Sequence, residues 1–324
     1  MNYESGINNY ELNEENLKLI EKKDILGDYV DKIKTFADFS KFKKMKIAAN
    51  PNFGIAGKAL DKILAGTAIE VVKINYEPNG NFPKGRPDPL IPENRYEISE
   101  LVIREKADLG VAWDADADRC FFFTEKGEFI EGYFMTALLA KIFLEKNPQS
   151  TIIHDTRLIW AIDDMVRINE GKSVNSKAGH AFIKERMRQE GAVFGGEMSA
   201  HYYFRDYFYC DNGMIPLVMM LEFLSPQDKK LSEIMQELFW NKYFVSGEIN
   251  SEVADVQKIL AKIEEKFKDA KKIDKTDGIS VEYPEWRFNL RGSNTEPVIR
   301  LNVEAKSQEL MEQKKDDLLG LIRS

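Results

Sequence analysis

Short apolar runs alternate with amphipathic stretches from residue 45 onward, and this alternation limits the chain to folds that layer helices on a sheet. The predicted elements of the first stretch are strands at 45–49, 69–74 and 108–113, helices around 59–64 and 98–103, and a proline-rich loop at 79–92. Strand, helix and strand in this order favour a parallel α/β layer.

The same alternation of strands and helices occurs a second time, before the pattern changes beyond residue 247. After a predicted hairpin turn at 125–128, the expected elements are a helix at 135–144 and strands at 151–154, 173–175 and 192–194. Beyond residue 247 they are helices at 253–267 and 308–322 and β-rich runs at 279–283, 286–290 and 298–303. We therefore predict two α/β domains with mixed or parallel sheets flanked by helices, followed by a smaller C-terminal α+β domain. The predicted divisions are a tail at 1–23 and domains at 24–128, 129–243 and 244–324.

Charge, cysteine content and apolar stretches limit the partners, the kinds of site and the location that we expect for the protein. Lys and Arg number 46 against 54 Asp and Glu, so the formal net charge is −8 and we expect neither a nucleic acid nor a membrane as partner. Cys120 and Cys210 have no partners at metal-ligand spacing, which argues against a disulfide framework or a zinc site. The first residues lack the basic and apolar regions of a signal peptide, and Pro216 and Glu222 interrupt the longest apolar stretch. We therefore expect a cytoplasmic protein.

Three alternating aspartates follow the third predicted strand. Asp114, Asp116 and Asp118 stand directly before Arg119. Carboxylates at this spacing repel one another unless a hard divalent cation takes their oxygens, and the end of a strand is the usual ligand edge of an α/β sheet. We interpret the aspartates as a metal site and Arg119 as a cation suited to phosphate.

Two other interpretations of this segment come from different classes of protein. An EF-hand loop fails, because it needs Gly where Arg119 stands and because residues 121–123 have the pattern of a strand. A phosphatase in which Asp114 attacks phosphorus stays open on this segment alone.

A second polar segment follows the strand predicted at 192–194. It places Glu197, Ser199 and His201 within five residues, which gives a carboxylate, a hydroxyl and a titratable ring. This set suits hydrogen bonding to a polyol, and His201 could move a proton near neutral pH. Arg157 and His180 lie in similar loops after predicted strands, although each taken singly is better explained by a structural role than by a functional one.

A third polar segment lies between two β-rich runs near the C-terminus. It holds Arg291, Ser293, Asn294 and Thr295 around a glycine. One guanidinium together with hydroxyls, an amide and backbone N–H groups forms a suitable cradle for an oxyanion.

Together and in this order, the three segments resemble the α-D-phosphohexomutase family. Residues 114–120 resemble its metal loop, 196–201 its sugar-specificity loop and 291–297 its phosphate loop. The Glu-Met-Ser-x-His form of the second segment is similar to that of mannose-active bacterial members, whereas phosphoglucosamine mutases usually have Gln at position 198 and Gly at position 294. The resemblance covers about residues 24–324, and Ala115, where Gly is commonest, is a departure that should be tolerated.

The resemblance implies an activity and a role for each segment. The family interconverts hexose 6- and 1-phosphates, here those of mannose, through a hexose 1,6-bisphosphate that also activates the enzyme, and this supplies GDP-mannose synthesis. The implied metal is Mg²⁺ on Asp114, Asp116 and Asp118. The implied catalytic residues are Arg119, Arg157, His180 and His201. The implied substrate-binding residues are Glu197 and Ser199 for the sugar and Arg291, Ser293, Asn294 and Thr295 for the phosphate.

One part of the family pattern has no counterpart in the sequence. The first of the family's four domains carries a phosphoserine in a Ser-His-Asn-Pro-type segment, and no such segment occurs among the 324 residues. We therefore expect a chain that corresponds to domains two to four, binds hexose phosphate and is inactive alone, with the first domain as a partner in trans. The alternative is a non-catalytic protein that binds Mg²⁺ and sugar phosphate.

Overall fold

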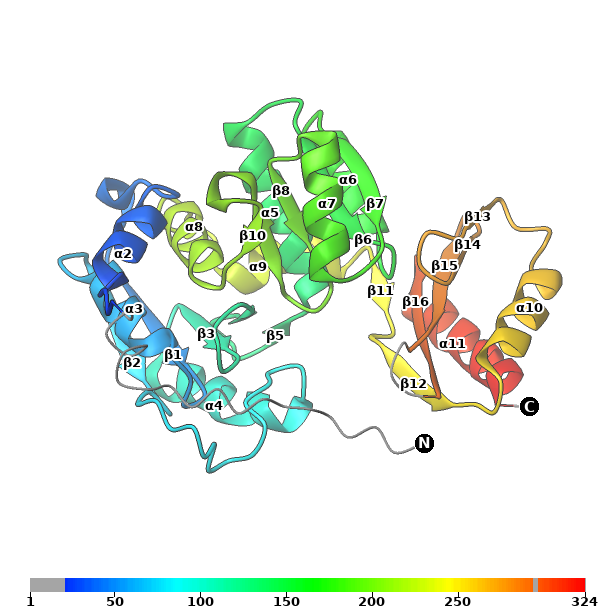
Figure 1. Cartoon of the computed structure of the whole chain (residues 1–324), viewed down its shortest axis with the longest axis horizontal. Helices are drawn as coiled ribbons and strands as arrows, with labels where there is room; N and C mark the ends of the chain where they lie inside the picture. Colours follow the sequence, from blue (N-terminus) through cyan, green and yellow to red (C-terminus); the bar gives the residue numbers. More distant parts are fainter. Residues whose placement is uncertain (1–20, 294–296, 324) are drawn as a thin grey trace.

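The computed structural model describes residues 21–293 and 297–323. Within these ranges the chain forms three sheets, each built from one stretch of sequence and flanked by helices (Figure 1). This arrangement confirms the predicted class of two α/β units followed by an α+β unit. The predicted domain boundaries remain a proposal.

The first sheet is parallel through its first three strands and antiparallel beyond them. Its strands are β1 (Met45–Asn50), β2 (Ile69–Lys73), β3 (Leu109–Trp113), β4 (Cys120–Phe123) and β5 (Phe129–Ile130), in the spatial order β2-β1-β3-β4-β5. Its helices are α2 (Leu26–Lys34), α3 (Ala56–Leu64) and α4 (Tyr96–Glu105), the last packed on β1 and β3. Because β4 runs back along β3, the loop 114–119 is a tight connection between antiparallel neighbours at the carboxyl edge of β3.

The second sheet repeats this plan in the middle of the chain. Its strands are β6 (Thr151–Asp155), β7 (Lys172–Ser176), β8 (Phe194–Gly196), β9 (Tyr202–Phe204) and β10 (Cys210–Asp211), in the order β10-β9-β8-β6-β7. Its helices are α5 (Gly132–Lys146), α6 (Trp160–Ile168), α7 (His180–Glu190), α8 (Met214–Leu224) and α9 (Leu231–Met235). The strand predicted at 192–194 is shifted, because pairing with β6 begins only at Phe194. The polar segment at 197–201 is therefore the turn between β8 and β9.

The third sheet is antiparallel throughout. Its strands are β11 (Phe244–Val245), β12 (Ile249–Glu252), β13 (Lys272–Asp274), β14 (Ile279–Glu282), β15 (Trp286–Gly292) and β16 (Val298–Ala305). Its helices are α10 (Val256–Lys266) and α11 (Gln308–Ile322). The helix predicted from residue 253 begins at Val256, because the Asp255 carboxylate caps it by accepting a hydrogen bond from the Lys258 amide at 3.0 Å. Short helical turns elsewhere are η1 (Phe39–Lys41), η2 (Pro92–Arg95), η3 (Arg205–Tyr207) and η4 (Gln236–Trp240).

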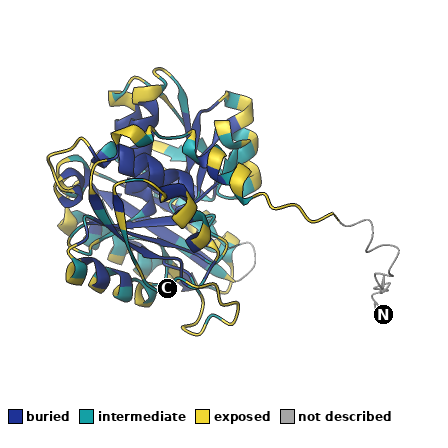
Figure 2. Cartoon of the chain, turned by 90° about the vertical axis from the view of Figure 1, so that its left-hand side faces the viewer, coloured by how far each residue is buried: buried dark blue, intermediate teal, exposed yellow. Residues whose placement is uncertain are grey.

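A shared apolar core joins the first two sheets, whereas the third sheet has a core of its own. Helix α8 is buried along almost its whole length and contacts α2, α5 and β4, so it connects the two α/β units. Figure 2 shows these central helices and strands as buried and the outer helix faces as exposed. The burial of apolar surface in this shared core therefore holds the loop at 114–119 and the turn at 197–201 close together.

A buried ion pair within the third sheet forms hydrogen bonds with the backbone of the second unit and so connects the two. The Glu304 carboxylate accepts hydrogen bonds from the amides of Ile159 and Trp160 at 3.2 and 3.3 Å, at the start of α6. The Arg287 guanidinium lies 3.5 Å from Glu304 and donates to the carbonyls of Thr156 and Arg157 at 2.9 and 2.8 Å. Burial raises the pKa of Glu304, although Arg287 opposes the rise. The third sheet thus fixes the backbone that carries Arg157.

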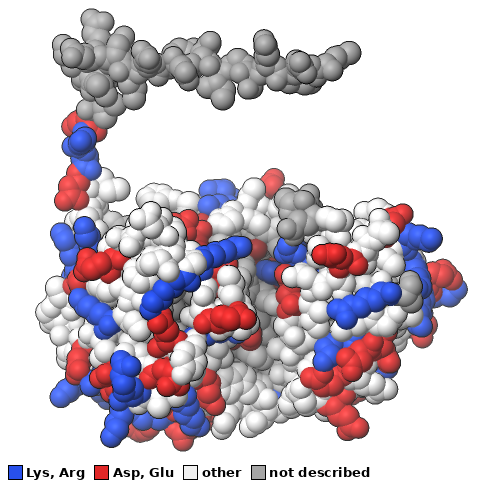
Figure 3. All heavy atoms as spheres, turned by 90° about the horizontal axis from the view of Figure 1, so that it is seen from below, with Lys and Arg blue, Asp and Glu red and all other residues white. Residues whose placement is uncertain are grey.

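The surface is mixed in charge and recessed between its two halves. Figure 3 shows basic and acidic side chains interspersed over one face, with a hollow between the third sheet and the rest of the molecule. Among the described residues, no helix is both long enough and apolar enough to cross a membrane.

Candidate active site

The loop of residues 114–119, called the aspartate loop below, places its carboxylate oxygens close together, as a metal site requires. Asp114, Asp116 and Asp118 each place a carboxylate oxygen within 4.8 Å of the others. The Oδ1 atom of Asp118 is buried and accepts no hydrogen bond from any described residue. A set of hard carboxylate donors with an unused buried oxygen fits Mg²⁺ or Ca²⁺ rather than a soft transition metal.

Two glycines hold the backbone of this loop from opposite sides. Gly54 approaches so closely that a Cβ atom there would lie 2.3 Å from the Ala115 carbonyl oxygen. A Cβ atom on Gly213 would lie 2.6 Å from the Ala117 carbonyl oxygen, which accepts the Gly213 N–H at 3.0 Å. Ala117 adopts a left-handed φ of 58°, whereas Ala115 does not have a positive φ. The methyl group of Ala115 therefore meets no backbone strain of this kind.

Arg119 closes the loop onto its first aspartate. Its Nε atom lies 2.5 Å from Asp114 Oδ2, and its Nη1 atom lies 3.0 Å from Oδ1 of the buried Asp88. Burial and the neighbouring Asp118 raise the pKa of Asp114 to about 6, although Arg119 opposes this rise. Burial works against ionisation of Asp118 too, but His201 and Arg119 bring its pKa down to about 2. Asp88 lies in the proline-rich loop, and the sequence offered no signal for its role.

The sugar-loop segment packs directly against the aspartate loop. Arg119 and His201 form an isolated antiparallel bridge, and the Cys120 amide donates to the Ala200 carbonyl at 3.3 Å. Within the turn, the hydroxyl of Ser199 lies 3.0 Å from Nδ1 of His201. Backbone pairing therefore fixes the His201 ring beside the metal-ligand candidates.

Glu197 is more deeply placed than the sequence suggested. Its side chain is buried, and its Oε1 and Oε2 atoms accept hydrogen bonds from the Gly179 amide at 2.9 Å and the Tyr203 hydroxyl at 2.6 Å. Its Oε2 atom also lies 3.5 Å from His201 Nδ1. Each oxygen retains a further lone pair, so the carboxylate can orient the turn and still accept from a ligand. Tyr203 lies in β9, and its significance depends on this contact with Glu197.

The two loop histidines face each other and two carboxylates. The rings of His180 and His201 are 4.5 Å apart between centroids. His201 Nε2 lies 3.6 Å from Asp118 Oδ2, and His180 Nδ1 lies 3.0 Å from Asp211 Oδ2. The hydrogen bond to Asp211 raises the pKa of His180, so this ring stays protonated to a higher pH than a free histidine. Asp211 lies in β10 and belongs to no motif that the sequence revealed.

Arg157 lies between the sugar-loop segment and the third sheet. Its Nε and Nη2 atoms donate to the two oxygens of Asp155 at 3.0 and 2.8 Å, and the side chain is buried. Its Nη2 atom is also 3.9 Å from Glu197 Oε1, and its Nη1 atom is 3.6 Å from Glu248 Oε2. Burial opposes its charge, but Asp155 and the other carboxylates raise the pKa of Arg157 above its usual value.

Two further arginines contact Glu248, one in the phosphate-loop segment and one on the neighbouring strand β16. Arg291, at the end of β15, and Arg300, directly opposite it on β16, lie 3.1 and 3.3 Å from the Glu248 carboxylate. The Ser293 amide donates to the Val298 carbonyl at 2.8 Å and closes the turn. Asn294 and Thr295 lie outside the described residues. Glu248 and Arg300 were missed in the sequence, because their significance depends on strand register.

These contacts form one line of alternating acidic and basic side chains through all three predicted segments. Successive pairs are separated by 3.6, 3.5, 3.9, 3.6 and 3.1 Å along Asp118, His201, Glu197, Arg157, Glu248 and Arg291. A cavity of about 580 Å³, a volume typical of small-molecule sites, meets this line at Asp118 and is also bordered by Asp116 and Asp211. The fold therefore brings together in one place the described residues that the sequence singled out.

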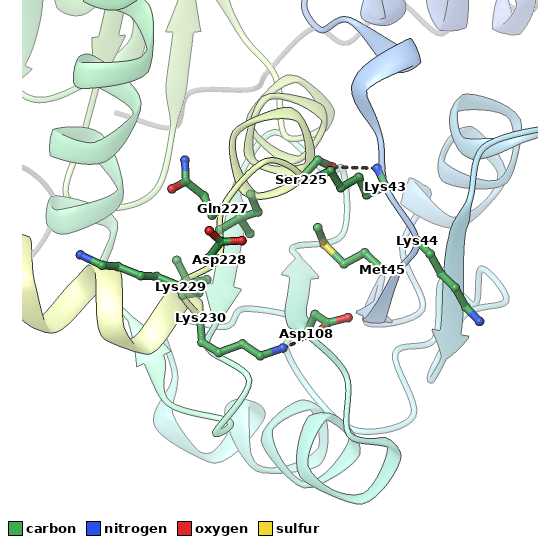
Figure 4. Close-up of a pocket in the computed structure, with 11 residues that line it drawn as sticks. Lys43, Lys44, Met45, Asp108, Ser225, Gln227, Asp228, Lys229 and Lys230 are labelled. Carbon is green, nitrogen blue, oxygen red and sulfur yellow. Dashed lines mark hydrogen bonds and ion pairs between the residues drawn. The ribbon is translucent and has the colours of Figure 1, made fainter.

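A second hollow lies at the opposite edge of the first sheet. It has a volume of about 250 Å³ and is lined by Lys43 and Lys44 before β1, by Asp108 before β3, and by Lys229 and Lys230 between α8 and α9 (Figure 4). Lys230 is paired with Asp108 at 2.9 Å, and the amide of Lys43 donates to Ser225 at 3.1 Å. None of the predicted site residues lines this hollow, and we assign it no function.

Comparison with known proteins gives consecutive matches along the chain. Models of phosphoglucomutase/phosphomannomutase alpha/beta/alpha domain II, alpha/beta/alpha domain III and C-terminal domain match residues 27–127, 131–243 and 248–321. A phosphomannomutase of Escherichia coli (strain K12) is 48% identical over 301 residues, which are 91% of this chain and 66% of the relative.

Solved structures show the same fold. A phosphoglucomutase/phosphomannomutase family protein from Burkholderia thailandensis has a TM-score of 0.81 at 29% identity, over 94% of this chain and 65% of its own. An N-acetylphosphoglucosamine mutase from Aspergillus fumigatus, solved with GlcNAc-6P and magnesium, has a TM-score of 0.66 at 13% identity, over 91% of this chain and 70% of its own. The chain thus spans about two thirds of the length of the proteins it matches. Its three consecutive domain matches and its identity to curated relatives show that the chain belongs to the phosphoglucomutase/phosphomannomutase family of α-D-phosphohexomutases.

Proposed function

We propose that this chain provides the metal-, sugar- and phosphate-binding parts of a phosphomannomutase, which interconverts mannose 6-phosphate and mannose 1-phosphate through a hexose 1,6-bisphosphate. The observation that carries the proposal is the unbroken line of acidic and basic side chains from Asp118 to Arg291. Metal-binding, proton-transferring and anion-binding groups placed in one line match a substrate with a sugar between two phosphates. The name of the E. coli relative favours mannose as the sugar.

The aspartate loop would hold Mg²⁺ and the reacting phosphate. Asp114, Asp116 and Asp118 supply the oxygen ligands, and Arg119 lies at the same edge of the loop. The bound cation supplies positive charge where the phosphoryl oxygens develop negative charge. Arg119 would orient the phosphoryl group through a donor not already taken by Asp114 or Asp88.

The sugar would lie over the turn that carries Ser199. Glu197 and Ser199 would accept and donate hydrogen bonds to its hydroxyls, while His201 moves a proton to or from the reacting oxygen. His180 stacks edge-on against His201 and would keep that ring in place. Arg157 would face the sugar phosphate from the side of the third sheet.

The non-reacting phosphate would bind at the third sheet. Arg291, together with Ser293, Asn294 and Thr295, would hold it by charge and hydrogen bonds. A substrate anchored by either of its two phosphate positions can bind in two opposite orientations. This property suits a reaction in which a bisphosphate turns around before it returns a phosphoryl group.

We propose further that the 324 residues bind the substrate without turning it over. The phosphoryl donor that the family uses lies on a phosphoserine segment, and no segment of this sequence has that form. Turnover would then need a polypeptide that carries such a segment. The alternative proposal is a protein that binds Mg²⁺ and sugar phosphate without catalysis.

Calorimetric titration with mannose 1-phosphate in the presence of Mg²⁺ tests the binding proposal. We expect Arg291→Ala to weaken binding by about tenfold, since a charge-assisted hydrogen bond is lost. Arg104→Ala, on the exposed face of α4, is the matched control and should leave binding unchanged. Equal affinities for wild type and Arg291→Ala would show that the phosphate is held elsewhere.

A coupled mutase assay separates the enzyme from the binding protein. The assay uses mannose 1-phosphate, Mg²⁺ and a hexose bisphosphate, first with this chain alone and then with the phosphoserine domain of a relative added. Activity only in the mixture supports an incomplete enzyme. Activity of the chain alone contradicts the need for that domain, and no activity in either case favours the alternative.

A further inference from the structure

One carboxylate occupies the centre of the arginine cluster at the third sheet. Glu248 lies 3.1 Å from Arg291, 3.3 Å from Arg300 and 3.6 Å from Arg157. Its side chain keeps 21% of its surface exposed, so it is accessible from the solvent. Asp155 already takes two donors of Arg157, so Glu248 serves chiefly Arg291 and Arg300.

The two arginines of the third sheet still have unused donors. The Nε atoms of Arg291 and Arg300 are buried and make no hydrogen bond with any residue that the structure describes. A guanidinium carries five N–H donors, and one carboxylate cannot satisfy two guanidiniums. The cluster is therefore built for an anion with more acceptor oxygens than Glu248 offers, and a phosphate group has them.

Glu248 is also placed where it can move. It directly precedes β12, on the segment that leads from the second sheet into the third, and it belongs to no strand or helix. Its contacts to Arg291 and Arg300 are single ion pairs that are only partly exposed, with 15% of the Arg291 side chain and 29% of the Arg300 side chain accessible to solvent. Partly exposed pairs of this kind contribute little to stability and exchange readily.

We propose that Glu248 is a built-in counter-anion that occupies the place of the substrate phosphate between Arg291 and Arg300, and that the phosphate displaces it on binding. This inference rests on the proposed function, because it assumes that a sugar phosphate binds at these arginines. The carboxylate keeps the two guanidiniums apart and oriented when no substrate is present. It also lowers the affinity for phosphate, which lets a bisphosphate leave the cluster and turn around.

Removal of the competing charge should tighten binding. We expect Glu248→Gln to bind both inorganic phosphate and mannose 1-phosphate about fivefold more tightly, because the phosphate then no longer has to break the partly exposed ion pairs of Glu248 with Arg291 and Arg300. Glu248→Ala should show the same gain, since it removes the carboxylate without leaving an amide acceptor. Glu252→Gln, at the exposed end of β12, is the matched control and should bind as the wild type does.

The sign of the effect distinguishes this role from a structural one. A variant that merely disturbs the third sheet binds phosphate more weakly, so unchanged or weaker binding by both Glu248 variants would overturn the proposal. The proposed function fails separately, if wild type does not bind mannose 1-phosphate or if Arg291→Ala binds it equally well. Tighter binding by the Glu248 variants together with weaker binding by Arg291→Ala supports both.

Discussion

Gly54→Ala should displace the aspartate loop and so weaken its metal site. The new Cβ atom would lie 2.3 Å from the Ala115 carbonyl oxygen and 2.8 Å from its carbon, where an ordinary contact begins at 3.4 Å. The loop must therefore retreat by about 1 Å, and its hydrogen bond from the Ile55 amide, now 3.0 Å, is lost or stretched. Overpacking of this kind costs about 1–3 kcal/mol of stability.

The effect on Mg²⁺ should exceed the effect on folding. Ligand distances in a metal site are tolerated within about 0.2 Å, so a shift several times larger should reduce Mg²⁺ affinity at least about tenfold. Calorimetric titration with MgCl₂ measures the affinity, and urea unfolding without metal measures the stability. Gly27→Ala, in α2, is the control, because its Cβ atom would meet no described atom within 4 Å. This control should stabilise the chain by about 0.5–1 kcal/mol and leave Mg²⁺ binding unchanged.

Two results of these measurements would contradict the prediction for Gly54→Ala. A folded Gly54→Ala variant with Mg²⁺ affinity within twofold of wild type would show that the ion does not bind in this loop or that the loop adapts without cost. Equal losses of affinity in Gly54→Ala and Gly27→Ala would show a general effect on the first unit. Neither result is compatible with a metal site whose geometry depends on the contact with Ala115.

Three other perturbations test the ionised groups of the structure. Asp114→Asn should abolish the rise in melting temperature that Mg²⁺ produces in wild type, and a rise retained by the variant contradicts the assignment. Mg²⁺ binding by wild type should weaken below about pH 6, because the Asp114 carboxyl then takes up a proton. Glu304→Gln should cost about 3 kcal/mol in urea unfolding, since it leaves the buried Arg287 without its counter-charge, and a loss below about 1 kcal/mol would show that the pair is dispensable. His154 is buried in β6, and although burial opposes protonation, the hydrogen bond to Asp163 raises its pKa. Its contribution to stability is thus full below its unfolded pKa of about 6.5 and is lost as the pH rises through the higher folded value. The unfolding free energy of wild type relative to His154→Gln should therefore fall as the pH rises above about 6.5, and a constant difference argues against the raised pKa.

The order of strands and helices could be predicted from the sequence, because each element depends mainly on residues that are close together in the chain. Alternating apolar runs predicted β1 to β3 and the helices between them, since burial of a strand or a helix face leaves a local period. The start of β8 was wrong by two residues, because Ala192 and Val193 are buried like strand residues but precede the pairing with β6. Strand ends depend on hydrogen-bonding partners, which a local pattern does not contain.

The same distinction between local and distant neighbours applies to the residues of the candidate site. Asp114 to Arg119, Glu197 to His201 and the turn after Arg291 were visible as motifs, because the residues of each lie within one short loop. Asp88 and Asp211 were not visible, since each lies alone in its segment and becomes significant only beside Arg119 or His180. Their partners are distant in the sequence, and only the packed fold makes them neighbours.

Residue types and their local pattern were enough to predict the class of fold and the three polar loops. The contact of Glu248 with Arg291 and Arg300 could not be predicted in this way, because it depends on the register of β15 against β16 and on the course of the segment before β12. The chemical type of a side chain is a property of the residue, whereas the partner that compensates its charge depends on where the fold places it. A buried or half-buried charge requires a partner within a few ångströms, and the fold selects which distant residue supplies it.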